Sequence, residues 1–373
     1  MNHKQTLYFI AKCLTISLED KNRREINKQL KLKSLNWDYI IKVSTDHYVL
    51  PALYCNLKRA DFLHYLPAEL VNYMQFITRL NRDRNQQIIQ ESKELNSLLL
   101  ANNIKPIFLK GTANILCNLY GDIAERMVGD IDIIISEKDY LNSIKVLKEN
   151  GYLEKRKHDF KPFPSRHHPR LICKNKIGAI EIHSQLLDVK NRDEFNYKFI
   201  SKDTQFFRDF EVLSFANKLN LSIISNYIND NGYHYKTINL RNAYDVFLLS
   251  KKTNAQNAIN KLEKLTFPLN CFLAVSHDLF NKVKSLDYNK SRRVASYLSA
   301  YSRQFSSPNT FKIKYKLINR FIIIKSTLKF YYKCIFHKEF RDLLIIRIRD
   351  KNWRKEKLIR FREKIKVKNK SPN

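Results

Sequence analysis

The chain has 373 residues, of which 44% are hydrophobic and 28% charged, and this composition excludes a protein that is disordered throughout. Its 68 Lys and Arg residues outnumber its 36 Asp and Glu residues, so the formal net charge is +32 and attraction to phosphate-rich partners or anionic lipid is expected. Its six cysteines are scattered without a Cys-x-x-Cys pair, which argues against a zinc or disulfide framework.

The first hundred residues are predicted to be helical. Apolar side chains recur there at spacings of three and four, with polar residues between them. Pro51 and Pro67 interrupt this pattern and are expected near helix starts or in loops. The pattern indicates a helical region over residues 1–103.

From Lys105 onward the pattern changes. Five of the six glycines lie between residues 111 and 178, where tight turns or a close approach of the backbone to a ligand are expected. Short apolar runs predict strands there, and amphipathic segments between them predict helices. The expected strands are 106–109, 130–135, 171–173 and 179–183, and the expected helices are 112–120 and 137–150, the second ended by Gly151. These elements form a compact β-α-β-α-β-β core over residues 104–205.

Beyond residue 210 the helical period returns. We expect a helical region over residues 206–310 and a basic helical extension over 311–373 with a disordered end. The extension holds 21 Lys and Arg and 5 acids, a balance of 21 − 5 = +16. The predicted fold class is therefore α+β, with a small mixed-sheet core flanked by N-terminal and C-terminal helical regions.

The sharpest chemical feature is the sequence Gly-Asp-Ile-Asp-Ile-Ile-Ile from Gly129 to Ile135. Side chains alternate along a strand, so Asp130 and Asp132 are expected on one face. Adjacent carboxylates repel one another and favour a divalent cation, and Mg²⁺ often joins one or two carboxylates to substrate phosphates. A solvated strand end is the alternative interpretation of so short a motif.

Two further segments supply candidate binding residues. Lys110, Gly111 and Thr112 stand between a strand and a helix, where backbone N–H groups can hold a phosphate; an ordinary tight turn is the alternative. Glu181 and His183 share one face of a later strand, so Glu181 can supply a third carboxylate if that strand neighbours the first. Two acids on one strand and one on the next suit two-metal phosphoryl transfer, whereas the solvated face of an edge strand is the alternative.

Six motifs follow one another in an order and spacing that resemble a known family. They are Leu109-Lys110-Gly111, Leu119-Tyr120, Arg126, Gly129-Asp130-Ile131-Asp132-Ile133, His167-His168-Pro169 and Glu181-Ile182-His183. Further similarity lies in the segments 46–54 and 240–245. The chain thus resembles the bacterial nucleotidyltransferase family 5 group, within the polymerase-β-like nucleotidyltransferase superfamily.

The resemblance implies transfer of a nucleoside monophosphate from a nucleoside triphosphate such as ATP to an acceptor, with release of pyrophosphate. Asp130 and Asp132 correspond to the metal-binding pair and Glu181 to the third catalytic carboxylate, and together they would hold Mg²⁺ or Mn²⁺. Gly111 and Thr112 correspond to the Gly-Ser turn that holds the triphosphate in the family.

This sequence departs from the family pattern at that turn. Gly-Thr replaces Gly-Ser, and the gap to the aspartate pair is longer than in minimal members. Lys110 and Arg126 are therefore expected to share the grip on the triphosphate. His183 would hold Glu181 in place or cap the sheet, while His167 and His168 could contact phosphate or base, or belong to an ordinary loop.

The basic tail admits several interpretations. Basic and aromatic residues interleave from Phe311 to Arg362, which suits RNA, an anionic membrane surface, or a solvated helix whose rings belong to the core. Contact with RNA or membrane is assigned to residues 311–370. No window reaches the roughly 18 apolar residues of a membrane-spanning helix. No signal peptide is recognised, and the cysteines are expected to be reduced thiols, so we expect a cytoplasmic protein. If the tail binds lipid, the protein would be peripheral to the inner face of the membrane.

Three functions remain open at this stage. The first is a metal-dependent nucleotidyltransferase whose acceptor is a nucleic acid, a protein or a small molecule. The second is an inactive protein of the same fold that binds RNA or an anionic membrane through its tail. The third is a metal-dependent glycosyltransferase. Intact carboxylates at all three positions favour activity over the second.

Overall fold

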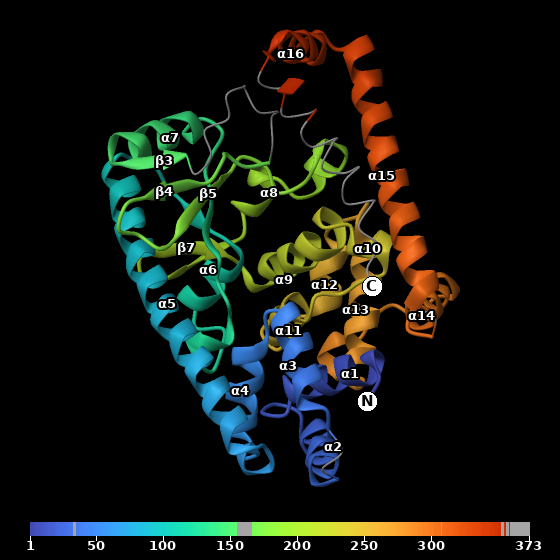
Figure 1. Ribbon diagram of the computed structural model, residues 1–373. Helices are drawn as coiled ribbons and strands as arrows, with labels where there is room; N and C mark the ends of the chain where they lie inside the picture. The colour runs from blue at the N-terminus through green and yellow to red at the C-terminus, as the bar shows by residue number, and fades with distance from the viewer. Residues whose placement is uncertain (33–34, 155–165, 307, 352–353, 356–357, 359–373) are drawn as a thin grey trace. The chain divides into compact units, whose positions relative to one another are not determined.

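The computed structural model describes residues 1–32, 35–154, 166–306, 308–351, 354–355 and 358 (Figure 1). They form two compact units. The larger unit contains the described residues of 1–154 and 166–308, and the smaller contains those from Asn309 onward. The prediction of an α+β fold is confirmed, because one mixed seven-stranded sheet lies among many helices. The regional boundaries at 103, 205 and 310 remain predictions.

The larger unit begins with helices, as the sequence predicts. They are α1 (His3–Cys13), α2 (Asp20–Lys31), α3 (Trp37–Asp46), α4 (Leu50–Arg59), the 3-10 turn η1 (Leu63–Tyr65) and α5 (Ala68–Ala101). Pro51 lies in the first turn of α4, where a missing N–H leaves no intrahelical bond unmade, and Pro67 directly precedes α5. Both prolines therefore mark helix starts.

The sheet has the strand order β3-β4-β5-β2-β1-β7-β6. Its strands are β1 (Ile107–Phe108), β2 (Asp130–Ile134), β3 (Tyr152–Glu154), β4 (Leu171–Cys173), β5 (Ala179–His183), β6 (Thr204–Phe207) and β7 (Phe210–Leu213). β2 pairs in parallel with β5 and antiparallel with β1. The two strands that carry the acidic motifs are thus direct neighbours inside the sheet.

The sequence prediction misses three strands and shifts two helices. β3, β6 and β7 were not expected, and the β6–β7 hairpin extends past residue 210 into the segment taken as helical. A run as short as Phe210–Leu213 is compatible with either period, so spacing alone cannot separate the two. The helices are α6 (Lys110–Leu116) and α7 (Tyr140–Glu149). Gly151 follows α7 with a φ of 84°, the left-handed conformation that commonly ends a helix.

The long helix α5 runs beside the sheet and fixes the turn that precedes β5 (Figure 1). The buried carboxylate of Glu91 accepts hydrogen bonds of 2.8 Å from the backbone N–H groups of Ile177 and Gly178. A Cβ atom at Gly178 would lie 2.7 Å from this carboxylate and 2.9 Å from the Ile131 side chain. Glycine is therefore needed where the turn approaches α5, and the contact sets the position of the strand that carries Glu181.

The remainder of the larger unit is helical. Its elements are η2 (Ile123–Glu125), η3 (Val189–Glu194), α8 (Tyr197–Ile200), α9 (Phe215–Ile223), the π-helix η4 (Ile224–Asn229), α10 (Gly232–Tyr235), α11 (Leu240–Ser250), α12 (Ala255–Asn260), α13 (Thr266–Leu279), η5 (Lys284–Leu286) and α14 (Arg292–Arg303). α9 packs against α6, α11 and β7, which joins the helical region to the sheet.

The smaller unit contains two helices, α15 (Pro308–Phe336) and α16 (Lys338–Arg349). The predicted disordered end lies outside the described residues. Among the helices that are described, none has both the length and the apolar character needed to cross a bilayer.

Candidate active site

Strand pairing brings the acidic side chains together. In the parallel β2–β5 pair, Asp132 lies opposite Glu181, and Asp130 lies opposite Ala179. Because side chains alternate along both strands, the two aspartates and Glu181 share one face with His183. The side chains do not form a solvated strand end, since Asp132, Glu181 and His183 are only 7%, 6% and 5% exposed. β5 is an interior strand, which also removes the edge-strand interpretation.

Asp132, Glu181 and His183 form a compact set of potential metal ligands. One atom from each lies within 4.8 Å of the other two. Two carboxylates and one imidazole suit a divalent cation such as Mn²⁺, and the carboxylates alone suit Mg²⁺. Asp130, which the sequence also predicted as a metal ligand, is half-buried on the same face, but its carboxylate forms an ion pair with Arg170. The donor set therefore fits a divalent ion. His183 belongs to this set, a role that the sequence analysis did not assign to it.

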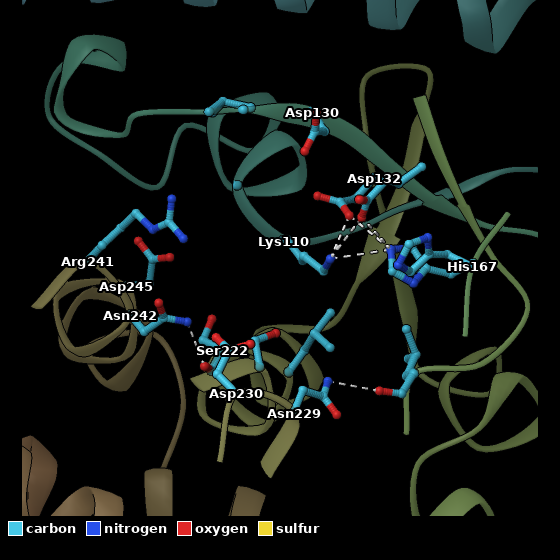
Figure 2. A pocket seen from close by; sticks show the side chains of 18 of the residues that line it. Lys110, Asp130, Asp132, His167, Ser222, Asn229, Asp230, Arg241, Asn242 and Asp245 are labelled. Atoms are coloured by element: carbon cyan, nitrogen blue, oxygen red, sulfur yellow. Dashed lines mark hydrogen bonds and ion pairs between the residues drawn. The ribbon is translucent and has the colours of Figure 1, made fainter. Parts of the chain in front are cut away.

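Two cations, Lys110 and Arg170, contact the three carboxylates, and Figure 2 shows Lys110 beside Asp132. Lys110 Nζ lies 2.6 Å from Asp132 Oδ1 and 3.6 Å from Glu181 Oε2. Arg170 lies between Asp130 and Glu181. Its Nη2 atom is 2.9 Å from Asp130 Oδ2, and its Nε atom is 2.8 Å from Glu181 Oε1. The positive charges thus stand beside the oxygens that a metal ion would use. Arg170 was not singled out in the sequence, although it directly follows the His-His-Pro motif.

These contacts set the ionisation of the cluster. Burial alone would raise the pKa of Glu181, but its contacts with His183, Lys110 and Arg170 hold that pKa well below its usual range. Burial likewise works to lower the pKa of Lys110, and the carboxylates of Asp132 and Glu181 raise it overall. The pKa of Asp130 is raised, chiefly by burial. Glu181 and Lys110 therefore remain an ion pair around neutral pH.

The backbone at the start of α6 aims Lys110 at the carboxylates. Lys110 has a φ of 52°, a left-handed conformation that costs a side-chain-bearing residue on the order of 1 kcal/mol. The next position approaches Arg126 so closely that a Cβ on Gly111 would lie 3.3 Å from the guanidinium carbon. The fully buried Thr112 donates its hydroxyl hydrogen to the Asp130 carbonyl oxygen at 2.9 Å. The hydroxyl thus supports β2, so direct contact of Thr112 with a nucleotide is not supported.

The carboxylates line one wall of a cavity of about 490 Å³. Figure 2 shows Arg241 across this cavity, with Ser222, Asn229 and Asp230 along another side. These residues come from α11, from α9 and from the π-helix that follows α9, so the helical region completes the site. Single π-helical turns within helices occur frequently at functional sites.

Arg126 also lines the cavity, and a network of buried hydrogen bonds holds its side chain. Its Nε atom donates to Asp245 Oδ2 at 3.0 Å, and Nη1 donates to the Met127 carbonyl oxygen at 2.8 Å. The Tyr120 hydroxyl donates to the other oxygen of Asp245 at 2.6 Å. The predicted binding residue Arg126 is therefore rigid, lines the cavity and lies directly behind Gly111.

Arg241 is a cavity residue that the sequence led us to discount. A helix pair four residues apart is normally an intrahelical ion pair, but Asp245 binds Arg126 instead. Within the described chain no carboxylate lies within 4 Å of the Arg241 guanidinium, and its buried Nε has no hydrogen-bond partner. Its guanidinium stands 5.0 Å from the Tyr48 ring centre, and burial and then Arg126 lower its pKa to about 10. Arg241 is thus a half-buried cation that lines the cavity; Asp245 and Asp230 act on its charge from a distance, but neither forms an ion pair with it within 4 Å.

The histidines of the predicted loop have different positions. His167 lines the cavity, and its ring centre lies 5.4 Å from that of His183. His168 does not line the cavity, and its Nε2 atom lies 3.6 Å from Glu154. His47, which the resemblance also included, accepts a hydrogen bond from the Leu240 N–H at 3.3 Å. Only His167 of these three is placed to meet a ligand in the cavity.

The geometry agrees with a comparison with known families. The model of a family described as uncharacterised nucleotidyltransferase matches residues 33–280. The chain belongs to this family. The matched segment includes both strands of the acidic cluster, Arg126, Arg241 and the π-helix, and it ends before α14. The resemblance stated from the motifs is confirmed. A comparison with curated proteins gave no match.

Membership in a nucleotidyltransferase family removes the support for a glycosyltransferase, which rested on the Asp-Ile-Asp motif alone. It gives a nucleotide as the substrate class.

Replacing Lys110 should change metal affinity in a direction that a merely structural lysine would not. We expect Lys110→Met to bind Mn²⁺ about tenfold more tightly in the absence of nucleotide. Two unit positive charges about 4 Å apart repel by ~4 kcal/mol at an effective dielectric constant of 20, so Lys110 and a divalent ion would repel by ~8 kcal/mol. The partial exposure of Lys110 reduces this value. Calorimetric titration with Mn²⁺ measures the change.

The matched control is Lys105→Met, which removes an exposed lysine five residues earlier. It should bind Mn²⁺ as the parent chain does. Unchanged or weaker binding by Lys110→Met would show that Lys110 does not compete with a metal ion.

Proposed function

We propose that this chain transfers a nucleoside monophosphate from a nucleoside triphosphate to an acceptor and releases pyrophosphate. The observation that carries the proposal is the opposition of Asp132 and Glu181 on neighbouring parallel strands, with His183 within ligand distance of both. Family membership supports the reaction class, and the arginine-lined cavity supports a polyphosphate substrate.

The carboxylate wall would hold a divalent ion. Asp132 and Glu181, with His183 beside them and Asp130 on the same face, would be its ligands. Bound Mg²⁺ or Mn²⁺ would neutralise charge on the phosphate oxygens and polarise the α-phosphate. Glu181 suits the role of ligand because its lowered pKa keeps it ionised. Lys110 and Arg170, released from the carboxylates, would be available to contact phosphate.

Arg126 and Arg241, which we call the arginine wall of the cavity, would hold the triphosphate. Arg126 offers a guanidinium fixed by Asp245, so it would bind an anion with little loss of side-chain entropy. Arg241 offers a half-buried charge whose Nε has no hydrogen-bond partner and which has no carboxylate within 4 Å in the described chain; binding of a polyphosphate would supply that partner. Arg126 would share this role with Lys110 and Gly111, which also line the cavity, and Arg241 would be added to the set that the sequence assigned.

The side of the cavity formed by α9 and the π-helix would bind the uncharged parts of the substrates. Asn229 donates its amide hydrogen to the Leu186 carbonyl at 3.2 Å, and its buried side-chain oxygen has no partner in the described chain. The buried hydroxyl of Ser225 likewise lacks one. These atoms would accept hydrogen bonds from a base, a ribose or the acceptor. The acceptor itself stays among nucleic acids, proteins and small molecules.

The proposal predicts loss of transfer from two conservative variants. Asp132→Asn and Glu181→Gln should each lower transfer by roughly 10³-fold, equivalent to ~4 kcal/mol, because each removes a charged oxygen from the metal site. Thermal unfolding should change little, since each variant leaves two carboxylates to balance the charges of Lys110 and Arg170. The assay incubates the protein with each α-labelled triphosphate, Mg²⁺ or Mn²⁺ and cell extract, and follows the molecular class that acquires label.

Glu149→Gln is the matched control, because this acid is exposed on α7 outside the cavity. It should retain full transfer. Full transfer by the Asp132 and Glu181 variants would refute the assigned site. Absence of labelling by the parent chain with every triphosphate would favour the inactive alternative.

A second variant separates triphosphate binding from metal binding. Arg241→Met should raise KM for the triphosphate at least about tenfold, because a cavity-facing charge is lost, while affinity for Mn²⁺ alone stays unchanged. The control Arg24→Met removes an exposed arginine of α2 and should alter neither quantity. An unchanged KM for Arg241→Met would exclude Arg241 from the triphosphate site.

A further inference from the structure

Helix α15 carries an uninterrupted apolar stripe. Its members recur at spacings of 4, 4, 3, 4, 3 and 4 residues, which at 100° per residue confines them to a sector of about 80°. Each is between 53% and 66% exposed. The stripe consists of Ile313, Leu317, Phe321, Ile324, Leu328, Tyr331 and Ile335. An apolar row of this length lies open to solvent on the helix, outside the segment matched by the family.

Positive charge flanks the stripe on both sides. At 100° per residue, Lys314 and Lys325 follow one edge, while Lys316 and Arg320 follow the other, and all four are exposed. Over its full length α15 contains seven Lys or Arg residues and no Asp or Glu. The helix therefore combines an apolar face with an exclusively cationic border.

The end of α15 is joined firmly to α16. Arg341 Nη1 donates to the Ile335 carbonyl oxygen at 2.7 Å, and Cys334 Sγ donates to the Phe340 carbonyl oxygen at 3.4 Å. Lys333 Nζ stands 4.7 Å from the Phe340 ring centre. The two helices thus form an ordered corner, and α16 adds further exposed isoleucines, Ile345, Ile346 and Ile348.

Charge distinguishes among the partners that could cover this stripe. From Leu317 to Ile335 the spacing matches a coiled-coil seam, but a second copy would bring Lys and Arg against Lys and Arg without any acid on α15 to pair with them. RNA would take the cations, yet it would leave the aliphatic row in water. An anionic bilayer satisfies both features, since headgroups attract the cations and the interface accepts the apolar side chains.

We propose that α15 lies on the surface of an anionic lipid bilayer, with its apolar stripe at the boundary between headgroups and acyl chains. The helix does not cross the bilayer, in keeping with the absence of a spanning helix among those described. This proposal is independent of the chemistry in the cavity, so either can fail alone.

Vesicle binding by the full chain tests the proposal. The probes are vesicles of phosphatidylcholine alone and vesicles of equal parts phosphatidylcholine and phosphatidylserine, separated from free protein by flotation. We expect binding to the anionic vesicles that falls steeply with added salt, and little binding to the neutral ones. The variant Leu317→Gln, Ile324→Gln, Leu328→Gln should weaken binding to anionic vesicles at least tenfold.

The matched control is Leu141→Gln, Leu153→Gln, Phe206→Gln, which removes three apolar side chains of the larger unit that are more exposed than those of the stripe variant. It should bind vesicles like the parent chain. A second variant, Lys314→Gln, Lys325→Gln, Lys329→Gln, keeps the stripe and should also bind less tightly. Circular dichroism and thermal unfolding show whether each variant retains the fold.

Three results would overturn the proposal. The first is equal binding of parent chain and stripe variant to anionic vesicles. The second is binding of tRNA, with no binding to vesicles, that the stripe variant retains. The third is a dimer in sedimentation that dissociates in the stripe variant, again without vesicle binding.

Discussion

Compensation of three clustered carboxylates by two cations is the interaction on which the site depends. Asp130, Asp132 and Glu181 lie on one sheet face, where burial and mutual repulsion oppose the gathering of negative charge. Lys110 and Arg170 contact these carboxylates and help to hold the pKa of Glu181 well below its usual range, and Lys110 adopts a left-handed backbone conformation to reach the cluster. The same contacts mean that a metal ion must displace positive charge from these oxygens. Binding of metal and release of Lys110 are therefore coupled in this account.

One part of the cavity lining comes from the sheet and the other from the helical region, and the two parts differ in chemistry. The sheet supplies Asp130, Asp132 and Glu181, whereas the helical region supplies Arg241 and a polar side that includes Ser222, Asn229 and Asp230. In the proposed function, the metal ligands would therefore lie on strands, and groups that recognise the substrates would come from helices. The family match over residues 33–280 includes the elements that form both parts. The helix α15 lies outside the matched segment. This fits the proposal that α15 binds a membrane surface and takes no part in the reaction.

Much of the acidic wall could be predicted because strand alternation is local. The period of two in Asp-Ile-Asp and Glu-Ile-His places the acids on one face of each strand, and the family resemblance implied that the acids of the two strands share one site. The arginine wall could not be read in this way, because the partner of Asp245 is Arg126, 119 residues earlier, rather than Arg241 on the same helix. Arg170 was missed for a similar reason, since its partners lie on two strands. The β6–β7 hairpin was missed because its strands are too short to show a period.

The most direct test of the coupling is a crystal structure with Mn²⁺ and a non-hydrolysable triphosphate analogue, in which anomalous scattering locates the metal. The account predicts Mn²⁺ bound by oxygens of Asp132 and Glu181, with Lys110 Nζ moved from Asp132 to a phosphate oxygen. Mn²⁺ bound away from both carboxylates, or Lys110 still paired with Asp132 beside a bound metal and nucleotide, would contradict it.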